Sequence, residues 1–364
     1  MARVLATLLL GAWLIGCDPQ VGSSSAAVVY GPDDRLEVHE VPEGVHRRAA
    51  ESAVLMQTDA DFLDRSDPAN VRVTYEGILG ETEELCADVR FFDQPDPGYC
   101  SGILIDDRHV MTAGHCVETA DDCSAQYPWV FGYYYEGAGD LRTLTADDVY
   151  ECVDRVIYRN DLVGDYAIIE LGRPVVGHDP AILRTGTDPA PDGTALTLIG
   201  HPNGIPMKIA GDASVLDFDG RELFTDLDSF FGNSGSGVWD DAGLVIGITV
   251  AGSFPSDYQR RPGGRGCNEL VELTSGDEYE YVQPVHVPLG LFCGTGVSSV
   301  ACDGVTPIDG GPPGADAGAR DGGAPTRSDR DDDGCSCAAH GTRTSAGLVA
   351  LVLFGLRRRR LSER

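Results

Sequence analysis

The sequence contains a single lysine, Lys208, and its 27 lysine and arginine residues are outnumbered by 58 aspartate and glutamate residues. The formal net charge is therefore −31 at pH 7. Proteins that bind nucleic acid need a basic surface against the phosphates, so this balance excludes nucleic acid as an expected partner. An acidic surface favours solubility and carries no information about the fold.

The sequence also lacks any apolar run of the roughly 20 residues that a membrane-spanning helix requires. Its first short run, Val4 to Ile15, follows an early arginine and precedes Cys17, which is the arrangement of a signal peptide. The stretch "LIGC" resembles the bacterial lipobox, which implies lipidation of Cys17. An ordinary signal peptide is the alternative, and both predict that residues 1–17 direct export.

The second short run, Ala346 to Leu356, is followed by four arginines and preceded by Cys335 and Cys337. Residues 335–364 resemble the MYXO-CTERM sorting signal of myxobacterial surface proteins, which implies processing near the two cysteines. A weak membrane anchor is the alternative. We expect the folded part to lie at the outer membrane or cell surface, held by lipid or tail, or to be released.

Clustered metal-ligand spacing is absent as well. Setting aside Cys17, Cys335 and Cys337 leaves eight of the eleven cysteines, and none of the eight forms a CxxC or Cys/His cluster. An even number of cysteines in an exported chain favours disulfides over a metal site, and we expect no cofactor. The sequence leaves open the pairing of six of them: Cys86, Cys123, Cys152, Cys267, Cys293 and Cys302.

Long helical periodicity is largely missing between residues 49 and 302. Short apolar runs such as "SGILI", "YAIIEL" and "GLVIGITV" alternate there with Gly, Pro, Asp and Asn turns, which predicts an all-β barrel or sandwich. Residues 18–48 are polar and predict a tether or pro-segment, with Arg47 and Arg48 as a processing point. Residues 304–334, dense in Gly, Pro, Ala and Asp, predict a disordered linker.

One histidine stands in an informative context. In "YCSGILIDDRHVMTAGHCV", Cys100 and Cys116 bracket two apolar runs joined by a turn at Asp106 and Asp107. A hairpin of this length brings the chain back on itself, so a Cys100–Cys116 disulfide would fix the loop that presents His115. The segment resembles the histidine region of trypsin-like serine proteases, in which a CSG strand precedes a TA(A/G)HC motif. The resemblance implies that His115 is a general base.

The other histidines lack such a context, and His286 is left undecided. We expect a solvated or structural role for the remaining six: His39, His46, His109, His178, His201 and His340.

An aspartate precedes an apolar strand at a suitable place. In "NDLVGDYAIIEL", Asp165 begins a stretch that resembles the DxAxxxL pattern of the same family. The resemblance implies that Asp165 orients the imidazole of His115. Asp161 is the competitor, but it lies four residues further from the strand.

The serine comes from "FFGNSGSGVW", which holds Ser234 and Ser236 in a glycine-rich turn. Its "GNSGS" resembles the nucleophile loop of the bacterial glutamyl-endopeptidase-like branch (staphylococcal V8 type). The resemblance implies that Ser234 is the nucleophile and that the backbone N–H groups of Gly232 and Ser234 form the oxyanion hole. An α/β-hydrolase is disfavoured, because Ser236 breaks the GxSxG pattern and its histidine should come last.

The resemblance implies a fold and an activity. The fold is all-β, with two antiparallel six-stranded barrels over about 49–172 and 173–303 and the active site between them. The activity is that of a serine endopeptidase acting on proteins or peptides, and we expect a monomer. Two alternatives remain: a catalytically silent surface binding module and an esterase on the same fold.

Substrate preference is less determined. Asn233 replaces the aspartate of trypsin, as in the V8-type branch, and Thr249 replaces the histidine of that branch, which undermines a preference for glutamate. Asp228 lies six residues before Ser234, where trypsin carries its acidic pocket base. Asp228, with Ser229 beside it, would favour Arg or Lys before the scissile bond. The alternative is that Asp228 hydrogen-bonds loop backbone and faces away from the pocket.

Overall fold

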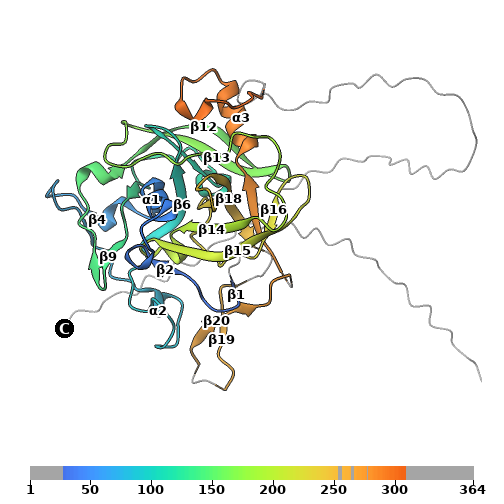
Figure 1. The fold of residues 1–364 in the computed structure, drawn as a ribbon. Helices are drawn as coiled ribbons and strands as arrows, with labels where there is room; N and C mark the ends of the chain where they lie inside the picture. Colours follow the sequence, from blue (N-terminus) through green and yellow to red (C-terminus); the bar gives the residue numbers. More distant parts are fainter. Residues whose placement is uncertain (1–27, 253–255, 264–265, 277, 309–364) are drawn as a thin grey trace, which may run out of the picture. The chain divides into compact units, whose positions relative to one another are not determined.

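The computed structural model describes residues 28–252, 256–263, 266–276 and 278–308 (Figure 1). Cys17 and the expected signal peptide, most of the expected linker and the whole expected tail lie outside the described residues. The described residues all fall within one compact unit. Across these ranges, no helix is long and apolar enough to span a bilayer.

The N-terminal half forms an antiparallel sheet of seven strands in the order β11-β8-β3-β6-β7-β13-β12. The strands are β3 (Ala53–Gln57), β6 (Gly98–Leu104), β7 (His109–Thr112), β8 (Trp129–Phe131), β11 (Val149–Tyr150), β12 (Cys152–Asp161) and β13 (Gly164–Leu171). Its two outer strands, β11 and β12, do not pair with each other, so the sheet is an open half-barrel.

The C-terminal half closes on itself. The strands β14 (Ala195–Gly200), β17 (Gly237–Asp240), β18 (Val245–Gly252), β22 (Glu280–Pro284), β16 (Leu223–Thr225) and β15 (Lys208–Phe218) pair in that order, and β15 pairs back onto β14. This ring is a closed six-stranded antiparallel barrel. The prediction of an all-β fold with two antiparallel halves is confirmed, with the difference that the N-terminal half does not close and has seven strands.

The sequence patterns explain these strands. In β18 the apolar and β-branched residues "VIGITVAG" are nearly all buried, as expected for a strand in the wall between two packed layers. Trp129 of β8 and Trp239 of β17 are both fully buried and belong to one apolar cluster, which contains residues of both halves. A continuous core of this kind holds the two sheets in a fixed relation, which positions residues that lie between them.

Shorter elements decorate the two halves. The two-stranded pairs are β1 (Val29–Tyr30) with β21 (Glu272–Leu273), β4 (Leu63–Asp64) with β5 (Arg72–Val73), β9 (Tyr135–Gly137) with β10 (Asp140–Leu141), and β19 (Tyr258–Arg260) with β20 (Asn268–Leu270). The helices are α1 (Val45–Ala49), α2 (Leu79–Thr82) and α3 (His286–Gly294), and α3 lies against β12 and β13 (Figure 1).

The segment 28–48, for which the sequence predicts a tether or pro-segment, is folded onto the barrel. Its strand β2 (Leu36–Glu37) pairs with β15, and β1 pairs with β21. Arg47 and Arg48, the expected processing point, lie within α1. In its described part, β-ladder hydrogen bonds hold the expected tether or pro-segment on the barrel.

Four disulfides join the described cysteines. Cys100 is bonded to Cys116, as the sequence predicts. The six cysteines whose pairing the sequence leaves open form Cys86–Cys267, Cys123–Cys152 and Cys293–Cys302.

Candidate active site

His115 and Asp165 come together because their strands are neighbours. His115 lies in a short 3-10 turn (Gly114–Val117) directly after β7, and Asp165 is the second residue of β13, which pairs with β7. The Nδ1 of His115 lies 2.6 Å from Asp165 Oδ2, and the backbone N–H of His115 donates to Asp165 Oδ1 at 2.9 Å. With its proton on Nδ1 facing the carboxylate, the ring leaves Nε2 as an acceptor, which a general base requires.

The glycine of "TAGHC" is required by close approach. A Cβ on Gly114 would lie 1.9 Å from the carbonyl oxygen of Arg159 and 3.0 Å from Asp165 Oδ1. Any side chain there would push β12 or Asp165 away from the histidine turn. Asp161, the competing aspartate, is turned elsewhere: its carboxylate binds the Arg159 guanidinium and the backbone N–H of Val163.

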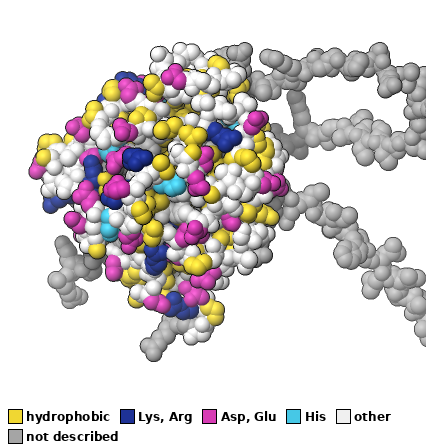
Figure 2. Space-filling model, in the orientation of Figure 1, with side chains coloured by type: hydrophobic (Ala, Val, Ile, Leu, Met, Phe, Trp, Pro, Cys, Tyr) yellow, Lys and Arg dark blue, Asp and Glu magenta, His cyan; other side chains and the backbone are white. Residues whose placement is uncertain are grey.

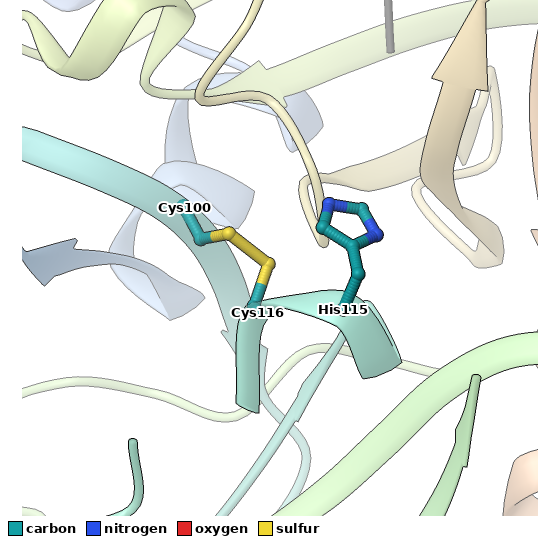
Figure 3. A group of neighbouring side chains, drawn as sticks. All are labelled: Cys100, His115 and Cys116. Carbon is teal, nitrogen blue, oxygen red and sulfur yellow. A yellow bond between two sulfur atoms is a disulfide. The ribbon is translucent and has the colours of Figure 1, made fainter. Parts of the chain in front are cut away.

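The Cys100–Cys116 disulfide ties this turn to β6 (Figure 3). The sulfur atoms of both cysteines and a ring nitrogen of His115 all lie within 4.8 Å of one another, as the ligands of a metal site would. Sulfur held in a disulfide offers no thiolate to a metal ion. The disulfide therefore anchors the turn that carries His115, and these three residues do not form a metal centre.

Ser234 opens on the same cavity as His115. It lies in the turn between β16 and β17 and is 7% exposed. Both residues line a cavity of about 480 Å³, whose walls include Val250 and Ala251 of β18 in the C-terminal half and Cys100 of β6 in the N-terminal half. The cavity thus lies between the two halves of the fold. Ser236, the other candidate serine, does not line it and donates to the Asn233 side chain at 3.1 Å.

The backbone around Ser234 turns two N–H groups, those of Gly232 and Ser234, away from the neighbouring hydrogen-bond partners. Gly232 has φ 87°, a conformation that favours glycine. The carbonyl of Phe231 accepts a hydrogen bond from the N–H of Asn203, and the carbonyl of Asn233 accepts one from Ser236 at 2.7 Å. In a trans peptide the following N–H points the opposite way, so the N–H groups of Gly232 and Ser234 are turned from these partners. Neither donates to any residue in the described part of the chain.

Ser101 fixes this loop from the other half of the molecule. The Ser101 hydroxyl donates to the Gly232 carbonyl at 2.8 Å, and its backbone N–H donates to the Ser234 carbonyl at 2.8 Å. The same hydroxyl accepts the N–H of His201 at 3.0 Å, and Ser101 is fully buried. The sequence did not predict this role, although Ser101 belongs to the CSG stretch that carries part of the resemblance to trypsin-like serine proteases.

Two further His–Asp pairs lie outside the cavity. His109 Nδ1 lies 2.8 Å from Asp106, and the hydroxyl of Ser299 donates to the same carboxylate. Here the aspartate lies between the serine and the histidine, so the imidazole cannot take the hydroxyl proton. His178 binds Asp148 at 2.9 Å and neither residue lines the cavity. Both pairs are buried, which supports the structural role expected for these histidines.

The residues expected in a specificity pocket are buried and do not line the cavity. Asp228 is 4% exposed and accepts the backbone N–H of Tyr30 at 2.7 Å and of Asp34 at 3.2 Å. Burial, together with the Asp34 carboxylate, raises the pKa of Asp228 to about 8. Ser229 and Thr249 are 3% exposed. None of Asp228, Ser229 and Thr249 lines the cavity, and Asp228 makes the backbone contacts of its alternative interpretation.

Comparison with known proteins bears on the whole site. Residues 100–248 match the family described as "Trypsin-like peptidase domain". This trypsin-like segment contains His115, Asp165 and Ser234 and covers less than half of the chain.

No curated protein matches the chain. A solved structure described as "Structure of Glu endopeptidase in complex with MPD" is similar at 17% identity and a TM-score of 0.40, covering 71% of this chain and 94% of the other. At that identity and TM-score, the similarity says nothing about the substrate of this chain.

Proposed function

We propose that this protein is a serine endopeptidase that acts outside the cytoplasm through Ser234, His115 and Asp165. One observation carries the proposal: His115, whose Nδ1 lies 2.6 Å from the Asp165 carboxylate, lines the same cavity as Ser234. The match of residues 100–248 to a trypsin-like peptidase family supports it. Four disulfides among the described cysteines suit an oxidising compartment and support export.

The mechanism follows from the positions of the donors. Ser234 attacks the scissile carbonyl while Nε2 of His115 takes the hydroxyl proton, and the Asp165 carboxylate stabilises the resulting imidazolium. The N–H groups of Gly232 and Ser234 stabilise the oxyanion that forms. His115 then protonates the leaving amine, and water hydrolyses the acyl-enzyme with the same base.

The location is part of the proposal. Residues 1–17 would direct export, with Cys17 as the lipidated residue, and residues 335–364 would sort the protein to the surface. Globomycin treatment of the native host, followed by electrophoresis of the protein, tests the lipid. A retained precursor supports lipidation of Cys17, and unchanged processing contradicts it.

Digestion of a diverse peptide library separates the proposed function from its alternatives. Cleavage by the wild type, its loss in Ser234→Ala and its retention in Ser236→Ala support the endopeptidase. An esterase would hydrolyse activated esters and leave every peptide intact. A binding module would leave both intact although the chain is folded.

A further inference from the structure

The cavity at Ser234 extends mainly over the N-terminal half. In the proposed mechanism His115 hands its proton to the leaving amine, so the residues after the scissile bond lie on the His115 side of Ser234. Beyond His115 the wall is the Cys100–Cys116 disulfide, with Tyr99 beside it on β6. A peptide substrate would therefore run its leaving-group half across the disulfide.

Aromatic rings flank that path. The rings of Tyr99 and Phe231 meet edge to face with centroids 5.6 Å apart, and both line the cavity. Tyr99 is 41% exposed and Phe231 43% exposed, although large apolar side chains usually find more cover. Tyr127 also lines the cavity. These rings provide contact area for a long aliphatic stem.

A buried amide in the same wall lacks partners. Gln57, the last residue of β3, is 1% exposed and lines the cavity. Neither its side-chain nitrogen nor its side-chain oxygen has a hydrogen-bond partner among the described residues. Both polar atoms are also shielded from the solvent in the cavity, so the amide is part of the wall and not a donor or acceptor for the substrate.

Two carboxylates complete the cavity. Glu118 and Asp122 both line it, and after burial itself they are the charges that raise the pKa of Tyr99. Glu118 Oε1 accepts from Asn160 and Asp122 Oδ2 accepts from Thr119. The other oxygen of each carboxylate accepts no hydrogen bond from a described residue. No lysine or arginine lines this cavity within the described ranges.

We propose that this cavity is a subsite for the leaving-group side of the substrate and that it prefers arginine or lysine at the first or second residue after the scissile bond. The aliphatic stem would pack on Tyr99 and the disulfide, and the cation would pair with Glu118 and Asp122 and contact the rings. Acidic side chains are spread over the face in Figure 2, and the net charge of −31 draws basic peptides towards the protein. The inference rests on the proposed function.

The test is the sequence profile of cleaved peptides from an unbiased library, read by mass spectrometry. We expect Arg and Lys to be enriched about three- to tenfold after the cut, the effect of two partly exposed ion pairs. The double variant Glu118→Gln, Asp122→Asn should lose this enrichment and keep the rate of labelling by a fluorophosphonate. Asn at 122 retains the oxygen that holds Thr119. The matched variant Glu272→Gln, Asp241→Asn removes two exposed carboxylates outside the cavity and should keep the enrichment.

Three results would overturn the subsite: cleavage without enrichment of Arg or Lys, enrichment of large apolar residues in their place, or enrichment that survives in the double variant. A folded wild type that neither reacts with the fluorophosphonate nor cuts any peptide rejects the proposed function, and the subsite with it. Normal labelling and peptide cleavage without enrichment of Arg or Lys after the cut would reject the subsite and leave the proposed function in place.

Discussion

The hydroxyl of Ser101 donates a 2.8 Å hydrogen bond to the carbonyl of Gly232, from one half of the fold to the other. The backbone N–H of Ser101 binds the carbonyl of Ser234 in the same way. The loop that carries Ser234 is therefore held by the strand that also carries Cys100. Through Cys116, the same strand holds the histidine turn, so β6 sets the positions of His115 and Ser234 together.

Ser101→Ala should impair catalysis more than binding. The change removes the bond to Gly232 and leaves the buried N–H of His201 without its acceptor, which costs about 1–3 kcal/mol in the free energy of unfolding. We expect kcat to fall about 10- to 100-fold, since the oxyanion donors lose their alignment, and KM to change much less. Steady-state kinetics beside a denaturant titration checks both. A less stable variant with unchanged kcat would show that Ser101 serves stability alone.

Asp165→Asn tests whether Asp165, and not Asp161, is the aspartate that orients His115. Asparagine keeps the shape but presents an amide to Nδ1 of His115, so kcat should fall by about four orders of magnitude. Asp161→Asn is the matched control and should stay within about threefold of the wild type, because its contacts are with Arg159 and Val163. A large loss in the Asp161 variant, or a small one in the Asp165 variant, would reverse the assignment.

His109→Ala tests whether the His109–Asp106 pair is structural, in contrast to the catalytic role proposed for His115 and Asp165. The substitution leaves the buried carboxylate of Asp106 without its imidazole partner and opens space beside Phe292, whose ring lies 4.8 Å from that of His109. We expect a loss of about 2–4 kcal/mol in the free energy of unfolding and an unchanged kcat. Chemical denaturation measures the first quantity. A selective fall in kcat would mean that His109 takes part in the reaction.

Asp228→Asn should change how stability depends on pH. Its folded-state pKa of about 8 lies above the usual value of 3.8, so the folded protein retains a proton that the unfolded chain releases. The stability contributed by the neutral acid is then complete below about pH 4 and declines as the pH rises towards 8. Relative to the wild type, the variant should gain in melting temperature over this range. Asp241→Asn, a control at an exposed position, should show no such gain. If the melting temperatures of the wild type and of Asp228→Asn changed with pH in the same way, the raised pKa of Asp228 would be contradicted.

The local motifs predicted that His115 meets Asp165 and that Ser234 lies near His115, because the histidine turn, the aspartate strand and the serine loop each occupy a short stretch with its own spacing. Ser101 could not be found that way. Its role depends on partners brought close only by the packing of the two sheets, the carbonyls of Gly232 and Ser234.

For Asp228, the position in the sequence suggested a role in the specificity pocket that its contacts do not support. Its offset from Ser234 suits an acidic pocket base, but its carboxylate binds backbone N–H groups of the N-terminal segment. Nothing in the polar composition of residues 18–48 indicated that this segment adds strands to the barrel. The closure of one half and the openness of the other are likewise decided by strand pairing over long sequence distances, which short-range patterns do not encode.

Mapping the site of fluorophosphonate attachment tests the central claim most directly. The folded protein is reacted, digested and analysed by mass spectrometry, beside Ser234→Ala, Ser236→Ala and His115→Ala. We predict a single adduct on Ser234, retained in the Ser236 variant, absent in the Ser234 variant and slower by several orders of magnitude without His115. An adduct on another serine, or none on a folded wild-type protein, would contradict the assignment of Ser234 as a nucleophile activated by His115.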